Sequence, residues 1–256
     1  MRVGFFDSGI GGLTVLYDAM RLLDDLDYIY YADIENVPYG TKDKDLVKEY
    51  VFAATDFIIR QGVDALVLAC NTATSIAVRE LRARYQLPII GMEPAVKPAV
   101  KNSGEKRVLV LATPLTLRED KYEDLVSRVD HNHIVDSLPL PGLVEFAESY
   151  QFKDPAVQEY LRGELVPFDL EKYGTIVLGC THFIYFKKLF RKIFPSGVQI
   201  IDGNEGTIRH LAKTLQIPLR EKESNPIDLL DKYVTLYLSG KKGNKEILRK
   251  YFAVLQ

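Results

Sequence analysis

The chain has 256 residues, of which 47% are hydrophobic and 27% charged, and its formal net charge is −2. A chain of this length and composition is long enough for one large or two small globular domains. Because it carries no excess of basic residues, neither nucleic acid nor an anionic membrane is an expected partner.

The N-terminal segment and the cysteine content point to a cytoplasmic protein. The first residues, MRVGFFD, lack the apolar stretch of a signal peptide, and no later stretch reaches the length of a membrane span. In a reducing compartment a structural disulfide is not expected. The two cysteines of the chain are therefore either small buried residues or reactive thiols.

Short apolar runs rich in Val, Ile and Tyr alternate with longer amphipathic stretches, which is typical of βα units in a parallel sheet. The first series predicts strands at 2–6, 27–32, 63–69 and 87–91, and helices at 12–23, 43–61, 72–84 and 94–101. The second predicts strands at 107–112, 133–137, 174–179 and 198–202, and helices at 116–129, 154–165, 183–193 and 204–216. The tail predicts a strand within 228–238 and a helix at 243–254.

The two series repeat one sequence pattern. VDALVLACNT at 63–72 and YGTIVLGCTH at 173–182 each contain an apolar run, a small residue, a cysteine and two polar residues that open a helix. A weaker similarity pairs residues 3–8 with residues 108–113. We therefore predict two related α/β halves that face each other. No linker of biased composition marks the boundary between them.

Both cysteines, Cys70 and Cys180, lie where a predicted strand ends and a helix begins. Ligands of open α/β sheets bind beyond the carboxyl ends of the strands, and a helix N-terminus there lowers the pKa of a thiol from its usual ~8.5. A lone cysteine at such a place is more often structural, but two at matching positions of a repeat favour a chemical role. One thiolate and one thiol on opposite sides suit racemisation, in which a proton leaves one face of a chiral centre and another returns to the other face.

Two polar neighbours of the strand ends suit proton transfer. Asp7 follows the first strand, and His182 lies two residues after Cys180. The alternative for each is to cap or orient the helix that follows it. The glycine-rich turn after Asp7, DSGIGG, lacks the spacing of a dinucleotide fingerprint or a P-loop and suits the approach of backbone amides to a small anion.

The segment VPYG at 37–40 predicts a loop at the next strand end, with Tyr39 and the amide of Gly40 near the same crevice. The alternative is an ordinary turn with a packing tyrosine. A zinc site at Cys180 and His182 is the main chemical rival. Zinc motifs normally bring paired Cys and His ligands, however, and no second pair lies nearby, so no metal is expected.

Four segments together resemble the signature segments of glutamate racemases, in the aspartate/glutamate racemase superfamily: FDSGIGG at 6–12, VPYG at 37–40, ACNTA at 69–73 and LGCTHF at 178–183. They occur in order and span most of the chain. The resemblance implies two α/β domains related by pseudo-twofold symmetry, each a mostly parallel sheet flanked by helices, with the active site in the crevice between them. The chain's end would return to the first domain, which gives 1–97 with 208–256, and 98–207.

The resemblance also implies an activity and a setting. The expected enzyme interconverts L- and D-glutamate without pyridoxal phosphate, metal or any other cofactor. It supplies D-glutamate for the peptidoglycan of the cell wall, and it is expected to form a homodimer.

Roles carry over by motif. Cys70 would take the proton from D-glutamate with Asp7 assisting, and Cys180 would take it from L-glutamate with His182 assisting. Glu145, in PGLVE, resembles a glutamate near the second thiol of the family, although the segment before it departs in length. The residues expected to hold the substrate, beside Asp7 and His182, are Ser8, Tyr39, Gly40, Asn71, Thr72, Thr181 and the threonine pair Thr113 and Thr116 of ATPLT.

One segment departs from the family pattern, and two alternatives stay open. ADIEN at 32–36 stands where most members have a GDTAR type of segment, so the loop that carries Tyr39 differs in shape or charge. The thiol pair also suits a racemase of aspartate, a hydantoin or another small acid. A silent binding or regulatory protein of the same fold is the alternative outside enzymes.

Overall fold

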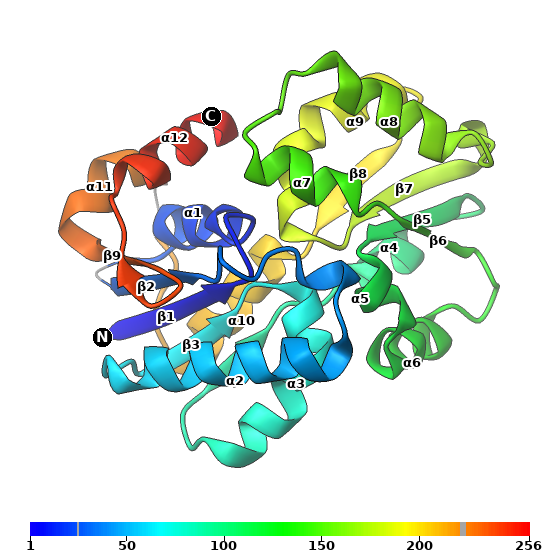
Figure 1. Cartoon of the computed structure of the whole chain (residues 1–256). Coiled ribbons are helices and arrows are strands. Elements are labelled where there is room, and N and C mark those ends of the chain that lie inside the picture. The colour runs from blue at the N-terminus through cyan, green and yellow to red at the C-terminus, as the bar shows by residue number, and fades with distance from the viewer. Residues whose placement is uncertain (25, 221–223) are drawn as a thin grey trace.

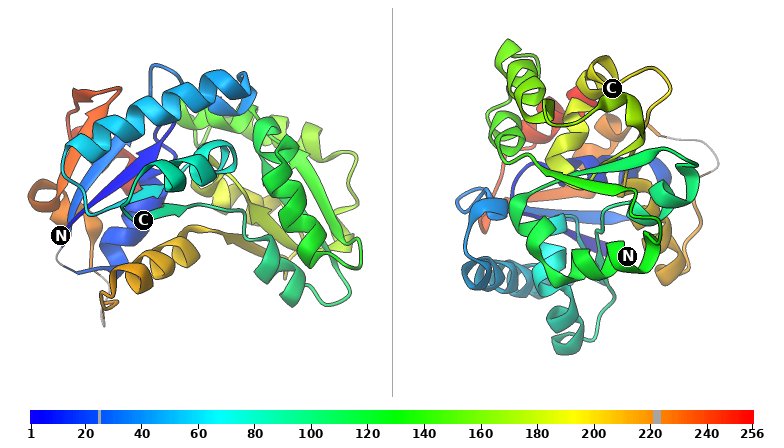
Figure 2. Two further views of the ribbon diagram at one scale, coloured as in Figure 1. Left: turned by 90° about the horizontal axis from the view of Figure 1, so that it is seen from below. Right: turned by 90° about the vertical axis from the view of Figure 1, so that its right-hand side faces the viewer.

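The computed structural model describes residues 1–24, 26–220 and 224–256. They form two lobes, each with a β-sheet between helices (Figures 1 and 2). The predicted fold class, two parallel-sheet α/β units flanked by helices, is confirmed. No helix in the described part of the chain is long and apolar enough to cross a membrane.

The first lobe is built on a sheet with the strand order β10-β9-β2-β1-β3-β4, and its pairs are parallel apart from β10 with β9. Its strands are β1 (Arg2–Asp7), β2 (Asp27–Ala32), β3 (Ala65–Leu68), β4 (Ile89–Gly91), β9 (Val234–Leu238) and β10 (Lys241–Lys242). Its helices are α1 (Leu13–Leu22), α2 (Lys44–Arg60), α3 (Asn71–Arg84), α10 (Asn204–Leu215), α11 (Pro226–Tyr233) and α12 (Glu246–Leu255), with a short 3-10 helix at Tyr39–Thr41.

The second lobe is built on a parallel sheet with the order β6-β5-β7-β8. Its strands are β5 (Arg107–Ala112), β6 (Val135–Pro139), β7 (Tyr173–Leu178) and β8 (Gln199–Asp202). Its helices are α4 (Val96–Asn102), α5 (Pro114–Arg118), α6 (Asp120–Val129), α7 (Gly142–Glu148), α8 (Pro155–Leu165) and α9 (Lys187–Ile193), with 3-10 helices at Leu170–Lys172 and Thr181–Phe186.

The predicted internal repeat is visible in the strand order. The run β2-β1-β3-β4 of the first sheet corresponds to β6-β5-β7-β8 of the second. Cys70 follows β3 and Cys180 follows β7, so each cysteine comes after the third strand of its half. The central strands are buried on both faces, which explains why their sequences are continuous apolar runs and not alternating ones.

The chain passes between the lobes twice, after β4 and after β8. The two connections touch, because a Cβ on Gly203 would lie 2.6 Å from the Met92 sulfur and 2.8 Å from the Glu93 carbonyl oxygen. One hydrophobic core includes residues of both lobes, from Phe5 in β1 to Phe186. The domain boundaries drawn at residues 97 and 207 stay a prediction.

Most predicted elements match within a few residues, but the tail and two helix starts differ. The strand predicted within 228–238 is β9, but the first part of that stretch belongs to helix α11, because Pro226 occupies the first turn of α11 and the Asn225 side chain accepts a hydrogen bond from the Ile227 amide. The helix predicted at 116–129 is broken by the extended backbone of Glu119 into α5 and α6. The helix predicted at 183–193 starts as a 3-10 helix, and α7 and β10 were not predicted.

Candidate active site

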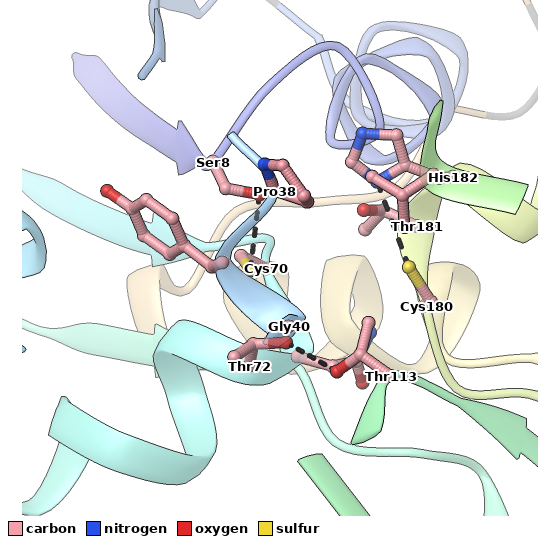
Figure 3. Close-up of a pocket in the computed structure, with 12 residues that line it drawn as sticks. Ser8, Pro38, Gly40, Cys70, Thr72, Thr113, Cys180, Thr181 and His182 are labelled. Atoms are coloured by element: carbon pink, nitrogen blue, oxygen red, sulfur yellow. Dashed lines mark hydrogen bonds between the residues drawn. The ribbon is translucent and has the colours of Figure 1, made fainter. Parts of the chain in front are cut away.

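A small pocket lies where the carboxyl ends of the two sheets meet (Figure 3). It is nearly closed: its free volume of about 10 Å³ is roughly what one water molecule needs. No lysine or arginine is among the described residues that line it. The lining residues are Ser8, Pro38, Tyr39, Gly40, Cys70, Asn71, Thr72, Thr113, Val144, Cys180, Thr181 and His182.

The two cysteines approach this pocket from opposite lobes and are both free thiols (Figure 3). Cys70 is the N-cap of α3, where its sulfur accepts a hydrogen bond from the Ala73 amide at 3.4 Å and contacts the Ser8 hydroxyl at 3.8 Å. Cys180 precedes a 3-10 helix and has no such amide. Its sulfur lies 3.7 Å from Nδ1 of His182 instead. The thiols are thus equivalent in topology but different in surroundings.

The thiol of Cys70 does not have the lowered pKa expected from its place at a helix start. Burial raises the pKa of Cys70 to about 12, and the negative charge of Asp7 adds to the effect. The hydrogen bond from the Ala73 amide lowers this pKa but is outweighed. In this closed pocket Cys70 is therefore a neutral thiol, the form that donates a proton.

Cys180, His182 and Glu148 form a row of hydrogen-bonded groups in the second lobe. His182 Nε2 lies 2.6 Å from Oε1 of Glu148, which also accepts a hydrogen bond from the Ile10 amide at 2.9 Å. Burial opposes a charge on His182, but its hydrogen bonds to Cys180 and Glu148 outweigh burial and raise its pKa well above 6.5. The row therefore favours an imidazolium next to the Cys180 sulfur.

Asp7 is fully buried at the end of β1, beside the pocket and not in its lining. Its carboxylate accepts hydrogen bonds from the Gly9 amide at 2.9 Å and from the Thr181 hydroxyl at 3.0 Å. Burial raises its pKa, although the charge of His182 and these two bonds work in the other direction. Asp7 thus connects the glycine-rich turn of the first lobe to the segment after Cys180 in the second.

Three threonine hydroxyls form a closed triangle across the lobes. Thr72 at the start of α3 lies 2.9 Å from Thr113 and 3.0 Å from Thr116, and the last two lie 2.9 Å apart. Thr113 is the N-cap of α5. Hydroxyls and the free amides at helix starts bind carboxylates, so this part of the pocket has anion-binding groups other than lysine or arginine.

Asn71 supplies a polar atom that no protein group satisfies. Its side-chain oxygen is buried in the pocket wall and has no hydrogen-bond partner in the described part of the chain. A buried acceptor without a partner is costly to a folded protein. Its place in the pocket wall suits it to accept a hydrogen bond from an N–H group of a ligand.

The loop predicted to carry Tyr39 to the pocket does so. The Tyr39 hydroxyl donates to Asp33 Oδ2 at 2.6 Å, and the backbone of Gly40 lies against Thr113, because a Cβ on Gly40 would be 2.4 Å from Thr113 Cβ. The departing segment at 32–36 is on the outer side of this loop, where Ile34 and Glu35 are exposed. The departure therefore changes the outer surface of the loop and not the pocket lining.

The structure places most of the predicted site residues together and moves one of them. Cys70, Cys180, His182, Ser8, Tyr39, Gly40, Asn71, Thr72, Thr113 and Thr181 line the pocket, with Asp7 and Thr116 hydrogen-bonded to that lining. Glu145 is exposed on α7 and outside the pocket lining, so its placement near Cys180 is corrected: the glutamate there is Glu148.

Sequence reasoning missed Pro38, Val144 and Glu148. Pro38 was visible in the loop motif but was given no role. Val144 and Glu148 are four residues apart and share one face of α7, the helix that was not predicted. A predicted helix at 142–148 would have separated Glu148 from Glu145, because the face that carries the apolar Val144 also carries Glu148.

Comparison with known proteins agrees with this fold. The sequence profile of the Asp/Glu/hydantoin racemase family matches residues 18–211. A glutamate racemase of Halothermothrix orenii is 55% identical and covers 100% of this chain and 99% of its own length.

Two solved structures are similar over nearly the whole fold. The glutamate racemase of Escherichia coli, in complex with L-glutamate and the activator UDP-MurNAc-Ala, has a TM-score of 0.78 and 28% identity, covering 95% of this chain and 99% of its own. The glutamate racemase of Francisella tularensis, in complex with D-glutamate, has a TM-score of 0.76 and 27% identity, covering 97% of this chain and 93% of its own.

Two facing α/β lobes with a thiol from each in one pocket define a racemase fold. The chain belongs to the Asp/Glu/hydantoin racemase family, and within it to the glutamate racemases. It is therefore an isomerase.

Proposed function

We propose that this protein interconverts L- and D-glutamate by proton transfer between two thiols and the α-carbon. The observation that carries the proposal is the position of Cys70 and Cys180 after equivalent strands of the two sheets, on one small pocket. A base and an acid on opposite faces of a carbon are what inversion by proton transfer requires.

The steps follow from the surroundings of each thiol. Starting from L-glutamate, the thiolate of Cys180 takes the α-proton and becomes a thiol, and the thiol of Cys70 gives its proton to the opposite face and becomes a thiolate. From D-glutamate the same steps run in reverse. The imidazole of His182, held by Glu148, lies 3.7 Å from the sulfur of Cys180 and is placed to exchange a proton with it.

Cys70 needs a change of surroundings before it acts as a base, since burial holds its pKa at about 12. The α-ammonium group of a bound amino acid brings a positive charge into the pocket. An opposite charge within ~4–6 Å favours the ionised form of a thiol. The ammonium group of the substrate thus lowers the pKa of the Cys70 thiol.

Glutamate is the proposed substrate because the site suits a small amino acid with two carboxylates and because related structures hold both of its enantiomers. The three threonine hydroxyls and the starts of α3 and α5 provide donors for carboxylates. Related structures hold L-glutamate and D-glutamate respectively. Aspartate, one methylene shorter, is the second candidate, since the same thiol chemistry serves it.

The proposal extends to the setting of the reaction. Membership of the glutamate racemases supports a reaction that needs no cofactor, in a cytoplasmic homodimer that supplies D-glutamate for peptidoglycan. Gel filtration with light scattering tests the homodimer, and dialysis against a chelator followed by assay tests metal independence.

The two thiols are tested by solvent exchange and optical activity. In D₂O the protein should replace the α-hydrogen of glutamate with deuterium and racemise either enantiomer, as followed by NMR and circular dichroism. Cys70→Ser and Cys180→Ser should each lower racemisation by at least about a thousandfold, because a serine hydroxyl is a far weaker acid than a thiol. Any remaining exchange should be confined to L-glutamate in Cys70→Ser and to D-glutamate in Cys180→Ser.

Rapid racemisation by both serine variants would overturn the mechanism, while faster turnover of aspartate than of glutamate would overturn the substrate. Unchanged far-ultraviolet circular dichroism is the control that both variants are folded.

A further inference from the structure

The turn between β9 and β10, near the C-terminal end of the chain, lies against the loop that lines the pocket. β9 pairs with β2, and Figure 1 shows it beside that strand. The Ser239 amide donates to the Ala32 carbonyl at 2.8 Å. The Ser239 hydroxyl accepts from the Glu35 amide at 3.0 Å and donates to Asp33 Oδ1 at 3.1 Å.

Asp33 is the point where these contacts join the pocket. Its carboxylate is 4% exposed and accepts hydrogen bonds from Tyr39 at 2.6 Å, from the Asn36 amide group at 3.0 and 3.1 Å and from Ser239. These donors are all neutral, so each carries a share of the solvation of a buried negative charge. Loss of one of these donors therefore weakens the hydrogen bonding that holds the Asp33 carboxylate in place.

Tyr39 transmits this arrangement to the pocket. Its ring is 1% exposed and packs near Phe6 and Tyr50, at centroid distances of 6.3 and 6.0 Å. Gly40 follows directly, with its backbone against Thr113 of the other lobe. The place of the Tyr39 ring therefore decides how closely this loop lies over the pocket.

The backbone of Ser239 gives a second, independent sign that its side chain matters. Its φ of 43° is in the left-handed region, where glycine and asparagine are favoured and serine is not. The next residue, Gly240, also has a positive φ, as expected of a tight hairpin turn. Serine at the first position keeps an unfavourable backbone conformation together with a hydroxyl that makes two hydrogen bonds.

We propose that Ser239 is a positioning residue for the substrate loop, defined as residues 37–41. It acts through Asp33 and Tyr39 and does not touch the pocket itself. The inference rests on the proposed racemase function. Its consequence is that Ser239 of the C-terminal hairpin, 206 residues from Asp33 in the sequence, helps to set the affinity for substrate.

The test compares variants with matched backbone effects. Ser239→Gly removes the hydroxyl and relieves the left-handed strain, whereas Ser239→Ala removes the hydroxyl and keeps the strain. Both should raise the KM for L- and D-glutamate about three- to tenfold, with kcat changed less than about twofold, because the hydroxyl acts on loop position and not on the thiols. His133→Gly is the control, since His133 has a φ of 54° and is exposed. It should leave both constants unchanged.

A second readout does not depend on activity. Amide hydrogen exchange of the peptide that contains residues 33–41 should be faster in both Ser239 variants, while the thermal midpoint of Ser239→Gly stays at or above that of the native protein.

Three results would overturn the inference: unchanged KM values in both variants, a raised KM in Ser239→Gly alone, or a fall of kcat in proportion to a loss of stability. If the native protein does not racemise glutamate, it is the proposed function that is wrong. Amide hydrogen exchange at residues 33–41 in the Ser239 variants then still tests whether Ser239 holds this loop.

Discussion

The imidazole of His182 lies between the Cys180 sulfur and the Glu148 carboxylate, and these two groups have different roles. The sulfur is the group that meets the substrate in the proposed reaction, whereas the carboxylate is partly shielded on α7 and fixes the ring. Its other hydrogen bond, from the Ile10 amide, ties it to the glycine-rich turn. Glu148 is thus a positioning residue for the imidazole and not a second base.

This role predicts the behaviour of Glu148→Gln. Without the carboxylate the pKa of His182 should fall, because a charged hydrogen-bond acceptor that raises it is lost. We expect kcat to drop about tenfold or more and the primary isotope effect to rise with 2-deuterated L-glutamate, since proton removal by Cys180 becomes slower than the other steps. NMR titration of the imidazole and isotope-effect kinetics check this.

Glu145→Gln is the matched control, being the same substitution on the same helix at an exposed position. An unchanged His182 titration in Glu148→Gln, or equal losses in both variants, would contradict the role given to Glu148.

At the scale of elements, the turn between β1 and α1 shows how closely the backbone approaches the site. A Cβ on Gly9 would lie 1.8 Å from Glu148 Oε1, and one on Gly11 would lie 2.4 Å from Nδ1 of His182. Glycine is required at these positions because another lobe packs directly against the turn. The turn and the polar row of the second lobe therefore form one unit.

Gly9→Ala should consequently act like Glu148→Gln. The added methyl group displaces the carboxylate from both the Ile10 amide and His182, so we expect a comparable loss of kcat. Combining Gly9→Ala with Glu148→Gln should cost less than the sum of the two effects. Additive losses in this double-mutant cycle, measured as kcat/KM, would show that the turn acts by another route.

Gly163 provides the contrasting case within a helix. It is exposed in α8, and nothing lies within 4 Å of the Cβ it lacks. Gly163→Ala should raise the free energy of unfolding by about 0.5–1 kcal/mol through the higher helix propensity of alanine, with racemisation unchanged. Urea denaturation measures the free energy of unfolding, and circular dichroism measures racemisation. A loss of stability would mean that alanine is strained at this point of α8.

Element prediction succeeded where the local pattern suits one kind of element and failed where it suits both a strand and a helix. Strand β5 and helix α3 follow from an apolar run and a periodic stretch, and both match closely. In the tail, strand β9 was predicted but helix α11 before it was not, because an apolar, Leu-rich run does not distinguish a buried strand from a helix. Pro226 and Asn225 before it were the available signals for a helix start.

At the scale of the whole molecule, buried tyrosines in both lobes make the stability of the fold depend on pH. Tyr28, Tyr30, Tyr39 and Tyr185 are all at most 8% exposed, and burial raises the pKa of each above the ordinary value of 10. In the unfolded chain these hydroxyls lose their protons near pH 10. Above that pH the folded state holds more protons than the unfolded state, so stability must fall as pH rises.

We therefore predict steep alkaline unfolding. Each of these tyrosines should remove about 1.4 kcal/mol of unfolding free energy per pH unit above pH ~10, and tyrosinate absorbance should appear together with loss of the far-ultraviolet circular dichroism. Tyr28→Phe should reduce the slope of unfolding free energy against pH by the contribution of one proton. Ionisation of all 15 tyrosines in a protein that stays folded would contradict the burial of these four hydroxyls.

The amino-acid sequence alone determined the features that depend on neighbours along the chain. Apolar runs set the strands, and each cysteine lies directly after such a run, so its place at a strand end and its counterpart in the other half are local properties. The repeat made the second half interpretable from the first. The motif resemblance that named the family rests on the same short segments.

Only the tertiary structure decided which distant side chains meet. Glu148 and not Glu145 holds His182, and Ser239 holds Asp33 across 206 residues of sequence. Such contacts depend on the direction in which a helix or turn presents each side chain once the lobes pack, and no local pattern encodes that direction. The pKa of Cys70 has the same origin, because the hydrogen bond at the helix start lowers it locally while burial in the folded protein raises it to about 12.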